Sequence, residues 1–126
     1  MKTAHVIMSG AVLGGLSVIL GAFGAHALTQ IFDAAQLAIW ETAVRYQMYH
    51  ALALLGIAVL AQVRPGVWLF RAAICMLVGV CLFSGSLYVL LFSGIRLIGI
   101  ITPVGGVCLI AGWLSLCIGA YQQAKD

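Results

Sequence analysis

The chain has 126 residues, of which 64% are hydrophobic and only 7% are charged, and its formal net charge is +3. A typical soluble domain is about 45–50% apolar and about 25% charged, so this composition excludes an ordinary water-soluble domain. The six Lys and Arg residues stand singly and form no basic patch, which excludes nucleic acid as a partner. The apolar residues fall into four runs, each long enough to cross a lipid bilayer as a helix of about 20 residues. The sequence therefore predicts a single transmembrane domain over residues 1–126, an all-α, polytopic four-helix bundle.

The first apolar run predicts a membrane span over about residues 4–24. Ala25-His26-Ala27 imitates a signal-peptidase site, but the run is longer than a signal-peptide core and three more spans follow, so we interpret it as a retained helix. Small residues recur in this span at intervals of four, three and four, which places them on one helix face where a neighbouring helix can approach closely. This first small-residue stripe consists of Gly10, Gly14, Ser17 and Gly21.

The second helix is expected to start at about Asp33, because Asp33 and Gln36 have the spacing of a capping box. Residues 33–42 predict an interfacial helical segment with Trp40 at the level of the lipid headgroups, and a membrane span follows over about residues 43–63. One continuous helix and a bent pair of helices both fit this pattern. Polar and charged side chains gather where the two segments meet, and these are Glu41, Arg45, Tyr46, Gln47 and His50.

Arg64-Pro65-Gly66 predicts a turn, after which the third span covers about residues 67–92. The fourth span is expected over about residues 97–121. Thr102 and Pro103 suit the N-cap and the first position of a helix, so the regular helix begins either before Pro103 or at it. A second small-residue stripe repeats at intervals of three and four along this span, and it consists of Gly105, Cys108, Gly112, Ser115 and Gly119. We expect the two stripes to pack closely, either with each other or with another chain.

The basic residues also predict an orientation. If both termini are cytoplasmic, that side carries Lys2, Arg64, Arg71 and Lys125, and the other side carries Arg45 and Arg96. The positive-inside rule then favours cytoplasmic N and C termini. The four cysteines lie inside apolar runs without CxxC spacing, and we interpret them as buried packing thiols rather than as metal ligands or disulfides.

Five short motifs follow one another along the chain: Gly21-Ala22-Phe23-Gly24-Ala25-His26, Tyr46-Gln47 with His50, Ser84-Gly85-Ser86-Leu87-Tyr88, Thr102-Pro103-Val104-Gly105-Gly106, and Gly112-Trp113. Together they resemble the YgdD-like family of small bacterial inner-membrane proteins, which is classed as a domain of unknown function. The resemblance covers nearly the whole chain. It implies a bacterial inner-membrane protein with four helices and no established activity, and it supplies no catalytic residues.

No nucleotide-binding motif, nucleophile–base arrangement or metal motif is present, so we expect no enzyme activity, no catalytic residue and no metal or other cofactor. The candidate polar cluster consists of His26, Glu41, Arg45, Tyr46, Gln47, His50 and Thr102. Glu41 and Arg45 fit a local ion pair or a proton or anion relay. His26 and His50 fit structural histidines, a proton- or ligand-handling pair, or the ligands of a haem or metal.

Two small-residue stripes and little polar chemistry favour a structural or accessory membrane subunit. Its partners are expected to be the lipid bilayer and either further copies of the chain or a larger membrane complex. The alternative is a small transporter or channel for a proton, ion or small solute, with Arg45, Gln47, His50 and Thr102 lining a polar cavity. A third hypothesis is a haem- or metal-binding membrane module that uses His26 and His50.

Overall fold

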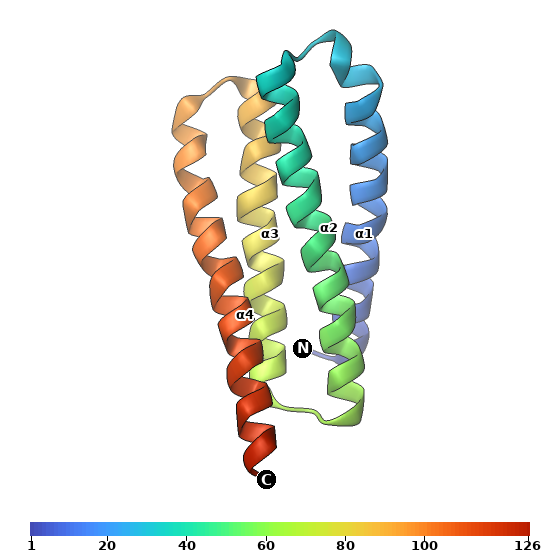
Figure 1. The fold of residues 1–126 in the computed structure, drawn as a ribbon, viewed down its shortest axis with the longest axis vertical. Helices are drawn as coiled ribbons and strands as arrows, with labels where there is room; N and C mark the ends of the chain where they lie inside the picture. Colours follow the sequence, from blue (N-terminus) through green and yellow to red (C-terminus); the bar gives the residue numbers. More distant parts are fainter.

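The structure, a computed structural model, describes residues 1–126 and is all-α (Figure 1). Its four long helices are α1 (Thr3–Ala25), α2 (Ala34–Val63), α3 (Val67–Ser93) and α4 (Ile101–Lys125). Two 3-10 turns, η1 (Ala27–Gln30) and η2 (Arg96–Ile100), lie in the connections at one end. All four helices are long and apolar enough to cross a membrane, which confirms the predicted fold class.

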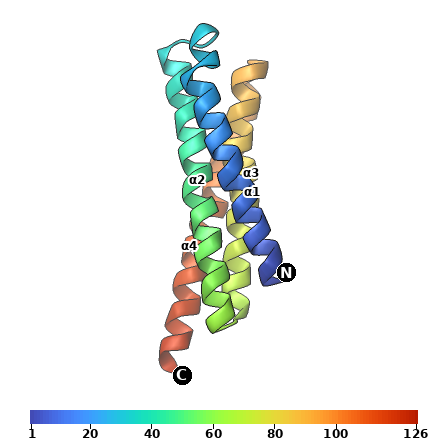
Figure 2. The same ribbon diagram turned by 90° about the vertical axis from the view of Figure 1, so that its right-hand side faces the viewer.

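The helices form a flattened bundle in which chain neighbours pack together, and both termini lie at the same end (Figures 1 and 2). Helix α2 packs on α1 and α3, and α3 packs on α4, whereas α1 and α4 form no interface with each other. The apolar core lies toward the terminal end, around Leu54 and Ile57 of α2 and Ala72 and Met76 of α3. Only 27 of the 126 residues are buried, so most of the surface of the edge helices α1 and α4 is left to lipid.

The capping box at the start of α2 is confirmed. The Gln36 backbone N–H donates to Asp33 Oδ1 at 2.8 Å, and the Asp33 backbone N–H donates to Gln36 Oε1 at 2.9 Å. From this cap α2 runs unbroken to Val63, so the segment expected over residues 33–42 is the first part of one 30-residue helix. At 1.5 Å per residue this helix is about 45 Å long, which exceeds the roughly 30 Å of bilayer hydrocarbon. Its first turns therefore have the length to reach the interface.

The start of α4 differs from the N-cap interpretation of Thr102. Helix α3 ends at Ser93, and the φ of 69° at the following Gly94 is in the left-handed region that favours glycine. The 3-10 turn η2 follows and passes directly into α4 at Ile101, so the regular helix begins before Pro103. Pro103 falls in the first turn, where a backbone N–H has no partner within the helix and its absence costs nothing. Thr102 is already helical and caps nothing, because its hydroxyl bonds to a neighbouring helix.

Each small-residue stripe faces its neighbour in the chain. A Cβ added at Gly10 of α1 would lie 3.0 Å from the Ala51 carbonyl oxygen of α2. In the second stripe, a Cβ at Gly105 would meet the backbone of Phe83, and one at Gly112 would lie 2.6 Å from Met76 Cγ, both in α3. The expectation that the stripes pack with each other or with another chain is therefore wrong, because each is used to bring two consecutive helices close together.

The remaining stripe residues lie on the same inner faces. Ser17, Ser115 and Gly119 are buried, Gly14 is in ordinary contact with Ala51, and a Cβ at Gly21 would lie 3.5 Å from Val44. Cys108, the other member of the second stripe, is only half-buried. All four cysteines are free: Cys81 and Cys117 are exposed, and Cys75 is half-buried. Their interpretation as buried packing thiols is therefore wrong for Cys81 and Cys117, which are exposed on the membrane-facing surface, whereas Cys75 and Cys108 are partly packed.

Candidate functional site

Gln47 joins three helices through one side chain. It is only 3% exposed, and its Nε2 donates to the Leu13 carbonyl oxygen of α1 at 3.0 Å. Its Oε1 accepts a hydrogen bond from the Tyr88 hydroxyl of α3 at 2.7 Å. Both ends of the amide are therefore engaged, as a buried amide in an apolar environment requires.

His50 lies one turn after Gln47 in α2 and is 4% exposed. Its Nδ1 lies 2.7 Å from the Tyr46 carbonyl oxygen, and the Trp113 indole N–H of α4 donates to its Nε2 at 3.0 Å. A carbonyl can only accept and an indole N–H can only donate, so the two contacts assign the neutral tautomer with its proton on Nδ1. The imidazole thus fastens α2 to α4 and has no ring nitrogen left for another ligand.

Trp40 connects α2 to α1 near the opposite end of the bundle from the termini. Its indole N–H donates to the Leu20 carbonyl oxygen at 2.9 Å, and its ring lies 4.7 Å, centroid to centroid, from that of Tyr88. A Cβ at Gly24 would lie 2.5 Å from Trp40 Nε1, so only glycine leaves room for the indole. This close approach explains why the first motif has a glycine at position 24.

Serine and threonine hydroxyls complete the contacts between helices. The Ser84 hydroxyl of α3 donates to the Ala43 carbonyl oxygen of α2 at 2.6 Å, and the hydroxyls of Ser86 and Thr102 lie 2.5 Å apart between α3 and α4. No buried side-chain nitrogen or oxygen lacks a hydrogen-bond partner. The polar groups of the interior are thus matched within the chain.

The structure does not gather the candidate polar cluster into one site. Gln47 points to α1 and α3, His50 points to α4, and Thr102 points to α3. Tyr46 is exposed and stacks on Phe83 at 4.6 Å. Each of these side chains is bonded or packed against a different neighbour.

Glu41 and Arg45 form an ion pair at 3.4 Å, with both side chains 64% exposed. An exposed pair four residues apart on a helix contributes about 0.3–0.5 kcal/mol. The geometry is that of a local pair, since neither side chain contacts a further ionisable group.

His26 and His50 do not come together. His26 is exposed at the end of α1, just after Gly24, which packs on Trp40. Trp40 precedes His50 by ten residues, so the two histidines differ by about 15 Å along the axis of α2. This separation, together with the occupied nitrogens of His50, contradicts a haem or metal shared by the pair.

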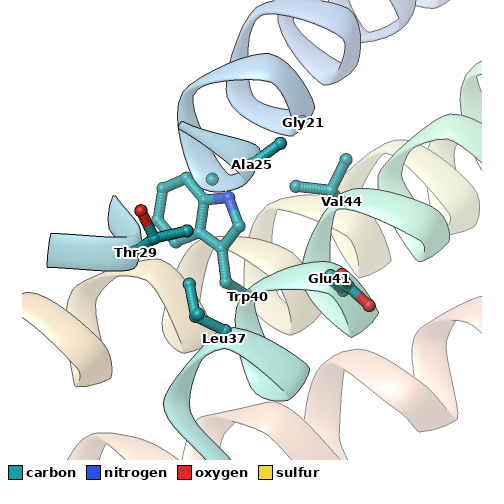
Figure 3. Close-up of a pocket in the computed structure, with 8 residues that line it drawn as sticks. Gly21, Ala25, Thr29, Leu37, Trp40, Glu41 and Val44 are labelled. Atoms are coloured by element: carbon teal, nitrogen blue, oxygen red, sulfur yellow. The ribbon is translucent and has the colours of Figure 1, made fainter. Parts of the chain in front are cut away.

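A pocket of about 250 Å³ lies between the end of α1, η1 and the start of α2 (Figure 3). Trp40 stands at its centre, with Thr29 and Glu41 at its edges. The Thr29 hydroxyl donates to the His26 carbonyl oxygen at 2.6 Å, and Glu41 is paired with Arg45. The polar side chains of the pocket lining are thus already bonded within the chain.

The candidate polar cluster did not include several side chains that carry these contacts: Trp40, Ser84, Ser86, Tyr88 and Trp113. Four of them lie in the motifs that carry the family resemblance, which was the signal available. Those motifs all map onto contacts between helices. Gly24 receives Trp40, Gln47 bonds to Tyr88, Ser86 bonds to Thr102, and Trp113 bonds to His50.

The fold and these contacts define a small polytopic α-helical membrane protein whose interior polar groups hold its helices together. The chain belongs to the family described as "Protein of unknown function (DUF423)", whose model matches residues 20–106. No solved structure matches the chain.

Relatives come from several bacteria. The chain is 41% identical to the UPF0382 inner membrane protein YgdD of Escherichia coli (strain K12), over 99% of this chain and 95% of the relative. It is 44% identical to the UPF0382 membrane protein YwdK of Bacillus subtilis (strain 168), over 92% and 95%. It is also 44% identical to the UPF0382 membrane protein SSP2132 of Staphylococcus saprophyticus, over 92% and 96%.

Proposed function

We propose that this protein is a structural or accessory subunit of the bacterial inner membrane, acting as a small homo-oligomer or within a larger membrane complex. The observation that carries the proposal is the complete internal pairing of its buried polar side chains. Groups that bind a substrate or relay an ion need a free donor, acceptor or water-filled space, whereas these groups serve contacts between helices. The proposed role includes no enzyme activity.

The transport alternative receives less support from the geometry. It requires Arg45, Gln47 and His50 to line one polar cavity, but Arg45 is exposed and the other two point to different helices. The third hypothesis, a haem or metal held by both His26 and His50, is contradicted by the separation of about 15 Å between these two histidines along the axis of α2.

The edge helices supply the surfaces for partners in this proposal. Val12 and Ile19 of α1 are 60% and 63% exposed, and Val107 and Leu114 of α4 are 66% and 59% exposed. Because α1 and α4 form no interface with each other, the outer side of each is free to meet lipid or another helix. We assign the partner contact to one of these two helices.

The proposed location is the inner membrane with both termini cytoplasmic. The inner-membrane name of the Escherichia coli relative supports the location. The orientation is supported by Lys2, Arg64, Arg71 and Lys125, which all lie toward the end that carries the termini. Arg45 and Arg96 lie toward the other end.

Two measurements together test the subunit proposal. Native mass spectrometry of the gently solubilised protein is expected to show one or more polypeptides in addition to the 13.3 kDa chain. A photoreactive residue at Val12 or Leu114, introduced one at a time, is expected to cross-link to protein from one of these helices in intact membranes. A single bare chain that cross-links only to lipid from both positions would contradict the proposal.

A further inference from the structure

A shallow groove runs along the outer face of α3 beside η2 and the start of α4. One part of the groove is a hollow of about 370 Å³. It is lined by Cys81, Gly85 and Val89 of α3 on one side, and by Ile98 of η2 and Ile101 of α4 on the other. A second hollow of about 380 Å³ also includes Val89 and extends to Phe92 and Ser93. Because Cys81, Gly85, Val89 and Ser93 are four residues apart, they follow one face of the helix and make the two hollows continuous.

The length and chemistry of the groove suit one acyl chain. From Cys81 to Ser93 is twelve residues, or about 18 Å, against about 15 Å for one leaflet of a bilayer whose hydrocarbon is about 30 Å thick. A Cβ at Gly85 would meet no atom within 4 Å, so this glycine leaves open space in the groove. The hydroxyls in the walls of the groove, those of Ser86, Tyr88 and Ser93, all have hydrogen-bond partners within the chain, so a ligand need not supply any.

An unpaired cation lies at the headgroup end of the groove. Arg96 is exposed and forms no ion pair, and it precedes the groove residue Ile98 by two positions in η2. The other charges at this end are engaged, because Glu41 pairs with Arg45 and Asp33 caps α2. A guanidinium binds phosphate through two parallel hydrogen bonds, which makes a phosphate the fitting partner for Arg96.

We propose that this groove binds one glycerophospholipid of the surrounding bilayer, with an acyl chain along Gly85 and the phosphate on Arg96. A helix from a second copy fits the site less well. The carboxylates that such a copy carries at this end, Asp33 and Glu41, already have partners within their own chain, whereas a phospholipid brings a free phosphate to Arg96. The site is independent of the proposed role as a subunit, since the bilayer itself supplies the ligand.

The test compares Gly85→Leu with Gly56→Leu. Both glycines have open space around an added Cβ, but Gly56 lies in α2 and lines neither hollow. Each protein is titrated with a phosphatidylglycerol in detergent, and the phospholipid adduct is measured by native mass spectrometry. Gly85→Leu is expected to weaken binding about tenfold, equivalent to about 1.4 kcal/mol, and Gly56→Leu is expected to leave it unchanged. Equal binding by Gly85→Leu and the wild type would overturn the proposal.

Arg96→Gln tests the headgroup contact, with Arg45→Gln as its control because Arg45 is already paired with Glu41. Binding is expected to fall for Arg96→Gln alone, and equal losses for both would contradict a site at Arg96. If Gly85→Leu does not fold, Val89→Trp fills the same groove from an exposed position.

A version with Cys81 as its only cysteine tests for a second copy in the groove. Oxidation in membranes is expected to give no Cys81–Cys81 dimer. An efficient dimer would show that the groove is a protein interface and would overturn the lipid assignment.

Discussion

At the scale of single residues, each interior polar side chain acts as a connection between helices. His50 shows this most clearly, because the direction of each of its two hydrogen bonds is fixed by its partner. Protonation at Nε2 would set an N–H against the Trp113 N–H and break the bond between α2 and α4. The same imidazole therefore reports whether that contact is intact.

The assignment of the His50 tautomer leads to a first prediction. ¹⁵N NMR of the imidazole in micelles near neutral pH is expected to show a protonated Nδ1 and an unprotonated Nε2. Trp113→Phe removes the donor to Nε2 and is expected to shift the Nε2 resonance while the Nδ1–H contact to the Tyr46 carbonyl persists. A proton on Nε2 in the wild type would contradict the assigned contact.

Gln47 and Tyr88 provide a second prediction, by double-mutant cycle. Gln47→Leu leaves the Tyr88 hydroxyl unpaired, and Tyr88→Phe leaves Gln47 Oε1 unpaired. Each change is expected to lower the free energy of unfolding by about 1–2 kcal/mol, measured by denaturant titration in micelles. The double mutant is expected to lose less than the sum, because the same hydrogen bond is removed twice. Additive losses would show that the two side chains are not coupled.

At the scale of elements, glycines set how closely consecutive helices approach. Gly105 and Gly106 of α4 are adjacent in sequence but differ in surroundings. A Cβ at Gly105 would meet only backbone atoms of α3, including the Leu82 carbonyl carbon at 2.8 Å, whereas one at Gly106 would lie 3.8 Å from the Phe83 ring. Backbone cannot rotate out of the way as a side chain can, so α3 and α4 would have to move apart at Gly105.

This difference gives a third prediction. Gly105→Ala is expected to lower the free energy of unfolding by about 1–3 kcal/mol through overpacking. Gly106→Ala is expected to be neutral or to stabilise the helix by up to about 1 kcal/mol, since alanine is the better helix former. Unfolding followed by circular dichroism measures both, and equal effects would show that α4 does not approach α3 as closely as the structure has it.

The positions of the helices follow from local sequence patterns, whereas the pairing of the helices does not. Asp33 and Gln36 predicted the start of α2 correctly because a capping box is a local interaction that involves only four consecutive residues. The stripe at Gly10 indicates that something approaches α1 closely, but not which helix, since that depends on the whole arrangement. Likewise, Gln47 and His50 are close in sequence but bond to different helices, so their proximity suggested a common site that the fold does not form.

At the scale of the whole molecule, the charges differ between the two ends of the bundle. The end with the termini carries four Lys and Arg residues, and the opposite half of the bundle carries Arg45 and Arg96 together with Asp33 and Glu41. An even number of spans puts both termini on one side of the membrane, so one reporter at either terminus reads the orientation of the entire bundle. The hydrophobic surface fits the bilayer equally well in either orientation, so the orientation depends on the distribution of the basic residues.

The final prediction concerns this orientation. A fluorescent protein fused after Asp126 is expected to fluoresce, and alkaline phosphatase fused there is expected to be inactive, because the former folds in the cytoplasm and the latter in the periplasm. Replacing Lys2, Arg64 and Arg71 with Gln changes the balance of basic residues from four against two to one against two. That variant is expected to become mixed or inverted, whereas Arg45→Gln with Arg96→Gln keeps the wild-type orientation because the balance becomes four against none. An active phosphatase on the wild-type C-terminus would contradict the proposed orientation. If the triple variant keeps the wild-type orientation, features other than the charge of the loops determine the orientation.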